Sequence, residues 1–217
     1  MCDLPPDKSK TSLNHETTSL NPNAPSLNQN TSPLNQNTSP LNQNTSPLNQ
    51  NAPSLTHPFE PVYDQNSRLL ILGSFPSVKS RELGFYYSHP RNRFWRLIAD
   101  LRGRRLPDSI DEKRRLLLDS GIALWDVCGE CEVTASADAS IKRVAVNDLA
   151  PIFAAAKIEA VFTNGRTAHE LYMKHLFSIW GLNAVYLPST SPANAAMNYD
   201  KLKSIWQNEL YKLLDSK

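Results

Sequence analysis

The chain has 217 residues, of which 40% are hydrophobic and 20% charged, enough for one ordinary globular domain with an appendage. Its formal net charge of +2 is too small to indicate a nucleic-acid partner by itself. No stretch approaches the about 18 apolar residues that a membrane span requires, and residues 1–10 contain no apolar signal segment, so we expect a soluble, cytoplasmic protein.

The first part of the chain, residues 1–57, is rich in Asn, Gln, Ser, Thr and Pro. Between residues 25 and 52 it repeats every seven residues, with a leucine followed by Asn-Gln-Asn in each unit. A single leucine per unit and the recurring prolines exclude a coiled coil, because proline removes a backbone donor and clashes with the preceding turn. We therefore predict a disordered tail over residues 1–57 that takes no part in the chemistry, followed by one globular domain over residues 58–217.

Short apolar runs alternate with amphipathic helical patterns in the predicted domain. Strands are expected at residues 68–73, 122–127, 158–163 and 183–187, and helices at residues 91–101, 111–119, 146–156, 167–179 and 199–214. This order predicts an α/β fold with three α/β/α layers around a central four-stranded parallel sheet. Because such sheets bind ligands beyond the carboxyl ends of their strands, the functional residues are expected directly after each strand.

Two features of composition leave alternatives open. The arginines cluster between residues 91 and 105, a pattern that fits either a solvated helix face or a nucleic-acid surface. Of the cysteines, Cys128 and Cys131 have the CxxC spacing of a redox pair, a reading that requires an unusually low thiol pKa. Together with Cys2 they are too few for a closed zinc or iron–sulfur site.

Three segments carry candidate chemistry. Residues 73–77 after the first strand read Gly-Ser-Phe-Pro-Ser, a tight turn whose amides can approach an anion or a base edge. Residues 84–95 read Gly-Phe-Tyr-Tyr-Ser-His-Pro-Arg-Asn-Arg-Phe-Trp and enter a helix. After the fourth strand, residues 187–194 read Leu-Pro-Ser-Thr-Ser-Pro-Ala-Asn.

These segments closely resemble those of the mismatch-specific uracil-DNA glycosylases, in which a His-Pro-x-Asn-Arg-Phe-Trp segment follows a Gly-x-x-Pro turn. The resemblance extends over about residues 69–210, and it identifies the chain as a member of the uracil-DNA glycosylase superfamily. The branch it resembles most is that of the hypoxanthine-DNA (deoxyinosine) glycosylases, which carry Gly-Ser-Phe-Pro-Ser at the first loop. This implies a monofunctional enzyme without metal or cofactor, acting on DNA as a monomer. It would flip out a deaminated base, hypoxanthine above all, and hydrolyse the N-glycosidic bond for base excision repair.

The resemblance also assigns roles to individual residues. Many members of the superfamily orient the attacking water with Asp or Asn at the third position of the first loop, where this chain has Phe75, so the catalytic residue falls on Asn92 instead. Asn92 as a helix cap is the structural alternative. Tyr87 matches the aromatic residue that stacks on the flipped base, unless it is a core tyrosine. Asp126 stands in place of a base-reading asparagine, and its carboxylate would either accept a hydrogen bond from hypoxanthine or have a structural role.

The loop after the fourth strand corresponds to one that grips DNA in the superfamily. Many relatives begin this loop with a histidine, and here the corresponding residue is Ser189, which casts doubt on efficient uracil excision. Serine hydroxyls in such a loop can donate to phosphates, or they can simply complete a polar turn. The residues expected at the base are Gly73, Ser74, Phe75, Tyr87 and Asp126, and those expected at the DNA backbone are Ser77, Arg91, Ser189, Ser191 and Asn194.

Other readings remain open at this point. The chain would instead be a uracil or mismatch-specific glycosylase, or a catalytically silent module that stacks a base on Tyr87 and its aromatic neighbours. A lyase mechanism would need Lys79 as the Schiff-base lysine, and no lysine is placed convincingly for that role.

Overall fold

The computed structural model of the protein describes residues 54–133 and 141–214. The seven-residue repeats lie outside the described residues, as does all of the predicted tail except residues 54–57.

The central sheet has four parallel strands in the order β3-β2-β6-β7. All five residues of β2 are buried, as expected for a strand covered on both faces. The register pairs the last residue of β2 with the last residue of β3, so the two strands end side by side. The strands are β2 (Leu69–Gly73), β3 (Ile122–Asp126), β6 (Ala160–Asn164) and β7 (Ala184–Leu187).

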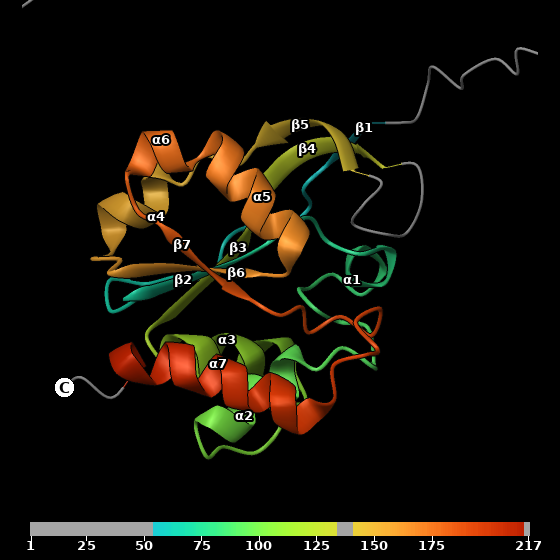
Figure 1. Ribbon diagram of the computed structural model, residues 1–217, viewed down its shortest axis with the longest axis vertical. Helices are drawn as coiled ribbons and strands as arrows, with labels where there is room; N and C mark the ends of the chain where they lie inside the picture. The colour runs from blue at the N-terminus through green and yellow to red at the C-terminus, as the bar shows by residue number, and fades with distance from the viewer. Residues whose placement is uncertain (1–53, 134–140, 215–217) are drawn as a thin grey trace, which may run out of the picture. The chain divides into compact units, whose positions relative to one another are not determined.

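Helices cover both faces of this sheet (Figure 1). One layer contains α2 (Phe94–Leu101), α3 (Ile110–Leu118) and α7 (Tyr199–Leu214), and the other contains α4 (Ala150–Ala155), α5 (Arg166–His175) and α6 (Phe177–Trp180). The predicted three-layer α/β/α fold with a four-stranded parallel sheet is confirmed.

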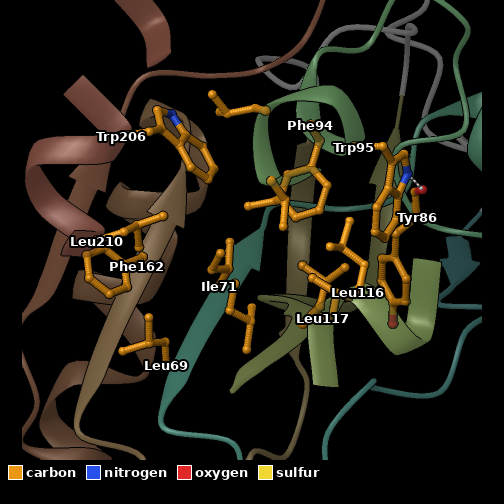
Figure 2. Close-up of a cluster of buried hydrophobic side chains, with 14 of the residues drawn as sticks. Leu69, Ile71, Tyr86, Phe94, Trp95, Leu116, Leu117, Phe162, Trp206 and Leu210 are labelled. Atoms are coloured by element: carbon orange, nitrogen blue, oxygen red, sulfur yellow. Dashed lines mark hydrogen bonds between the residues drawn. The ribbon is translucent and has the colours of Figure 1, made fainter. Parts of the chain in front are cut away.

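The hydrophobic core is divided by the sheet, because successive residues of a strand point to opposite faces. Leu69 and Ile71 of β2 pack in a cluster with Trp206 of α7 (Figure 2). Leu70 and Leu72 pack on the other face, in a cluster that includes the helices of the second layer. The indole Nε1 of Trp206 also donates to the carbonyl of Pro188 at 2.9 Å, which fixes the start of the loop after β7.

A second sheet was not predicted from the sequence. It is antiparallel, with the order β1-β4-β5, and consists of β1 (Ser54–Thr56), β4 (Cys128–Val133) and β5 (Ile141–Val146). β1 lies within the segment that the sequence assigned to the tail, so the structured part of the chain begins before the expected boundary at residue 57. β5 lies at one edge of this sheet, and its half-buried and exposed residues alternate only in part, since residues 142 and 143 are both exposed.

Several helix boundaries differ from the expectation. Residue 146 ends β5 and α4 begins only at residue 150, after a turn. The helix expected at residues 167–179 is divided into α5 and α6, and the short helix α1 (Val78–Glu82) was not expected. The helix expected from residue 91 begins at Phe94, because a turn closed by the hydrogen bond from the N–H of Asn92 to the carbonyl of His89 precedes it. Among the described residues, no helix is long and apolar enough to cross a membrane.

Candidate active site

The loops after β2, β3, β6 and β7 enclose a cavity of about 70 Å³ at the carboxyl edge of the central sheet. Ligands bind at this edge in open α/β folds. The structure brings most of the residues selected from the sequence to this cavity, and only Arg91 and Asn194 of that set do not line it. The selected residues that do line it are Gly73, Ser74, Phe75, Ser77, Tyr87, Asn92, Asp126, Ser189 and Ser191.

Sequence reasoning missed Asn164, which also lines the cavity. Its side chain locks the loop after β7, because Nδ2 donates to Oγ1 of Thr190 and Oδ1 accepts from the backbone N–H of Thr190, both at 3.0 Å. The signal was available in principle, since Asn164 directly follows the apolar run of the third central strand. The cavity is also lined by four other residues outside the selected set, Pro76, Ser80, Tyr86 and Thr190.

The first loop begins at Gly73, which lies directly against the Asp126 side chain. A Cβ built on Gly73 would come 2.1 Å from Oδ1 of Asp126 and 2.9 Å from the hydroxyl oxygen of Tyr87. Contacts below about 3 Å do not occur for real Cβ atoms, so this site needs the absence of a side chain at position 73. Oδ1 of Asp126 therefore lies against Gly73, and Asp126 lines the cavity together with Gly73 and Tyr87.

The rest of the first loop is held by its own contacts. Phe75 is 8% exposed and packs in a cluster with Cys128 and Cys131, so it lines the cavity as an apolar wall. The backbone carbonyl of Ser74 accepts from the N–H of Cys128 at 3.0 Å. The hydroxyl oxygen of Ser77 accepts from the N–H of Ser80 and caps α1. The contact with DNA expected for Ser77 would have to be made by the same hydroxyl group.

Tyr87 has a backbone φ of 51°, in the left-handed region that L-residues rarely occupy. Its ring stacks on Phe94 with centroids 4.2 Å apart and an interplanar angle of 28°. The ring is half-buried and lines the cavity. Uncommon backbone conformations cluster at functional sites, where the surrounding structure enforces them.

Asn92 lies before α2, whose first residue is Phe94, and not within the first helical turn where the sequence placed it. Its Oδ1 accepts from the backbone N–H of Phe94 at 3.0 Å, so the capping contact considered from the sequence is present. An amide oxygen has two lone pairs and the amide nitrogen carries two donors, so this contact uses only part of the side chain. Because Asn92 is half-buried and lines the cavity, its other amide lone pair and N–H groups can hydrogen-bond to a ligand.

Asp126 is paired with His57, a residue that the sequence assigned to the tail. Nε2 of His57 lies 2.9 Å from Oδ2 of Asp126, and the two side chains are 3% and 4% exposed. No motif pointed to His57, because it precedes the first recognisable strand. Burial raises the pKa of the neighbouring Tyr86, with a further contribution from the charge of Asp126, so the Tyr86 phenol stays protonated.

The loop after β7 is held by the guanidinium group of Arg93. Its nitrogen atoms donate to backbone carbonyls of the loop at residues 189, 190, 191, 194 and 197. The Arg93 backbone N–H donates to the Thr190 carbonyl as well, at 3.1 Å. The sequence placed Arg93 among the clustered arginines and in the His-Pro-x-Asn-Arg-Phe-Trp segment without assigning it a role. The structure gives it an internal role for which a planar fork of donors is suited.

The polar side chains of this loop also bond within it. Oγ of Ser189 accepts from the N–H of Ser191, and Oγ of Ser191 accepts from the N–H of Ala193, each at 3.2 Å. Nδ2 of Asn194 donates to the carbonyl of Ser189 at 2.9 Å. The two serine hydroxyls accept in these bonds, so their own O–H groups can still donate to a ligand.

A groove of about 380 Å³ adjoins the cavity and shares Tyr87 and Asn92 with it. Arg91 is exposed and lines this groove, together with Arg96 and Lys113. A further groove of about 600 Å³ between α2 and α3 carries the rest of the arginine cluster, where Arg105 is paired with Asp108 and Glu112. The cluster is therefore divided between internal bonds and two surface grooves.

The CxxC motif does not have the environment of a reactive pair. Cys128 and Cys131 are both buried in β4, and burial raises the pKa of the Cys131 thiol, opposite to what redox chemistry requires. In residues 54–133 and 141–214, no group of three or more His, Cys, Asp or Glu side chains is arranged to hold a metal ion.

The family of the protein follows from its similarity to known proteins. Residues 60–215 match the model of the Uracil DNA glycosylase superfamily. The chain therefore belongs to this superfamily of DNA glycosylases, as the sequence motifs predicted.

Individual relatives cover most of the described chain. The hypoxanthine DNA glycosylase of Methanosarcina acetivorans is 34% identical over 151 residues, which are 69% of this chain and 94% of the relative. The protein of the same name from Methanosarcina barkeri is 35% identical over 144 residues, 63% of this chain and 86% of the relative. A solution NMR structure from M. acetivorans, provisionally named a uracil DNA glycosylase, matches with a TM-score of 0.63 and 32% identity. It covers 72% of this chain and 96% of that chain.

Proposed function

We propose that the protein is a monofunctional, monomeric glycosylase that removes hypoxanthine from DNA by hydrolysis and leaves an abasic site. The observation that carries the proposal is that Tyr87, Asn92 and Asp126 line a single cavity at the carboxyl edge of the sheet. The names of the two curated relatives support the same base.

The substrate base has to leave the duplex to reach these residues, because the N-glycosidic bond is inaccessible inside the stack. The Tyr87 ring offers an aromatic face for the flipped base. Tyr87 and Asn92 border both the cavity and the adjoining groove. A base that enters the cavity would therefore leave its sugar and phosphates in the groove beside Arg91.

Asn92 is the residue proposed to act on the water. Cleavage of an N-glycosidic bond passes through an oxocarbenium-like state, which needs a well-placed water more than a strong nucleophile. The amide of Asn92 can hold a water by hydrogen bonds while its Oδ1 keeps the contact with the Phe94 N–H. An amide cannot take a full proton, so much of the rate would come from stabilising the departing base.

Asp126 is the residue proposed to read the base. Hypoxanthine has a ring N–H at N1, and Asp126 lines the cavity with Oδ1 beside Gly73, an oxygen that would accept this N–H in a hydrogen bond. Sites built on hydrogen bonds reject bases that leave a buried group unpaired, and they do so more steeply than apolar pockets.

The loop after β7 is proposed to hold the phosphates that flank the flipped nucleotide. Ser189 and Ser191 border the cavity and retain O–H donors, and the Arg93 bonds keep the loop backbone fixed. Arg91 adds a cation at the groove, Ser77 lines the cavity from the first loop, and Asn194 bonds to Ser189 within the loop after β7. Contacts of this kind set the position of the DNA without reading its sequence.

The experiment that tests the proposal is a cleavage assay on duplexes that contain hypoxanthine, uracil or ethenoadenine at one position. Release of the base followed by alkaline cleavage of the abasic strand is expected for hypoxanthine, fastest among the three. Binding without release of any base would instead support a silent DNA-binding module. Faster release of uracil would support a uracil-specific enzyme.

A further inference from the structure

The structure assigns to His57 the role of a positioning residue that holds the Asp126 carboxylate so that Oδ1 can accept the N1–H of the flipped purine. This inference deepens the proposed function and rests on it. It brings into the site a residue that lies before residues 60–215, the part of the chain that matches the family model.

The pair is buried and shaped by its surroundings. The side chains of His57 and Asp126 are 3% and 4% exposed, with Nε2 and Oδ2 2.9 Å apart. Aromatic rings surround the imidazole, with centroid distances of 5.7–6.3 Å to Phe59, Phe75, Tyr86 and Trp125. A hydrogen bond in such an apolar enclosure is electrostatically strong, and its loss would leave a carboxylate buried without its partner.

The direction of this hydrogen bond follows from the carboxylate, since an ionised carboxylate only accepts and Nε2 must then carry the proton. The backbone N–H of Phe59 lies 3.2 Å from Nδ1 and can donate to its lone pair in a neutral ring protonated on Nε2. The carbonyl of Phe59 also lies 3.0 Å from Nδ1, where it can accept from a ring protonated on both nitrogens. In both forms Nε2–H donates to Oδ2 of Asp126, so the orientation of the carboxylate is kept in either state.

The hydrogen bond between His57 and Oδ2 also fixes the position of Oδ1, the other carboxylate oxygen of Asp126. With Oδ2 bonded to His57, Oδ1 is the carboxylate oxygen left beside Gly73, and Asp126 lines the cavity there. The proton on Nε2 offsets part of the carboxylate charge, which otherwise would oppose the departure of an anionic base. An Asp126 carboxylate bonded to His57 therefore opposes the departure of the base less than an isolated carboxylate would.

The backbone before His57 fixes its place. β1 pairs with β4 in antiparallel register, and the N–H of His57 donates to the carbonyl of Gly129 at 2.7 Å. β4 begins at Cys128, directly after Asp126 and Val127, so the strand that anchors His57 is continuous with the strand that carries its partner. The end of the predicted tail therefore forms a strand that positions the His57 side chain at the active site.

The test uses the full chain with His57→Leu, His57→Gln and His57→Asn. The amide nitrogen of glutamine can reach the position of Nε2, whereas that of the shorter asparagine reaches only about the position of Nδ1. We would measure affinity for duplexes with an uncleavable 2′-fluorinated deoxyinosine, or with the matching nucleotide of unsubstituted purine, which has no N1–H. Single-turnover release of hypoxanthine would be measured in parallel. His175→Leu is the control, since this histidine lies at the end of α5 and outside the cavity.

The native chain is expected to bind the deoxyinosine duplex at least about tenfold more tightly than the purine duplex, the effect of one hydrogen bond to a charged group. His57→Leu and His57→Asn should reduce that ratio to within about threefold, and His57→Gln should retain most of it. The inference is overturned if His57→Asn or His57→Leu keeps the native ratio, or if Gln and Asn behave alike.

The two hypotheses fail in different ways. If the native chain binds deoxyinosine selectively but releases no base, the proposed function fails while the affinity ratios still test His57. If hypoxanthine is released at the same rate by every His57 variant, the proposed function stands and the inference about His57 fails. Thermal melting of each variant identifies any that does not fold, and the pair of Gln and Asn substitutions then decides the result without the Leu variant.

Discussion

Gly73 and Asp126 are register partners at the ends of β2 and β3, and the hydrogen of Gly73 faces Oδ1 of Asp126 where a methyl group would come within 2.1 Å. Because Asp126 is also bonded to His57, its carboxylate has no room to move away from a larger residue.

Gly73→Ala is therefore expected to destabilise the protein by about 1–3 kcal/mol, the usual cost of overpacking, and to reduce hypoxanthine release by more than about tenfold. The double variant Gly73→Ala with Asp126→Ala should recover most of the lost stability without recovering release. Denaturant unfolding and single-turnover assays on the same samples check both effects. Equal stability of Gly73→Ala and the native chain would contradict the close contact.

Asn92→Ala should reduce single-turnover release by on the order of a hundredfold while binding of DNA changes only a few-fold. Since Oδ1 of Asn92 also accepts from the Phe94 N–H, a loss of about 1 kcal/mol of stability is expected as well. Asn198→Ala is the matched control, because Oδ1 of Asn198 caps α7 through the N–H of Lys201 and lies outside the cavity. If both variants lose activity equally, the role of Asn92 is structural.

Hypoxanthine should leave faster than uracil from otherwise identical duplexes at saturating enzyme. Three features support this order: the Gly-Ser-Phe-Pro-Ser loop, the carboxylate of Asp126 and the serine at position 189 where many relatives have a histidine. Asp126→Asn should move the ratio of the two rates toward uracil, because an amide can both donate and accept. Faster release of uracil by the native chain would refute the substrate but not the class of enzyme.

Removal of residues 1–53 should leave release of hypoxanthine within about threefold of the native rate. Removal of residues 1–57 should lower it by more than about tenfold, because it also deletes β1 and His57. His57→Leu in the shorter truncation separates loss of the side chain from loss of the strand. If removal of residues 1–57 left the rate of hypoxanthine release unchanged, neither β1 nor His57 would contribute to the reaction.

The central fold could be predicted because each of its strands is a continuous apolar run between helical patterns. The antiparallel sheet could not, since β1 has three residues and β5 lies among charged residues with only a weak alternation. The motifs located Gly73, Tyr87, Asn92 and Asp126, all of which the structure brings to one cavity. Partners that depend on tertiary contact, above all His57 for Asp126, left no local signal in the sequence.

The bonds of Arg93 join parts of the chain that are synthesised far apart. The carbonyls it holds lie 96 to 104 residues further along the sequence. A nascent chain that has released the segment with Asn92 from the ribosome still lacks the loop that completes the cavity, and α7, which secures that loop through Trp206, follows the loop in the chain. Chains that stop before α7 therefore carry the residue proposed to position the water without a secured loop to hold DNA, and the complete site can form only after α7 has been synthesised.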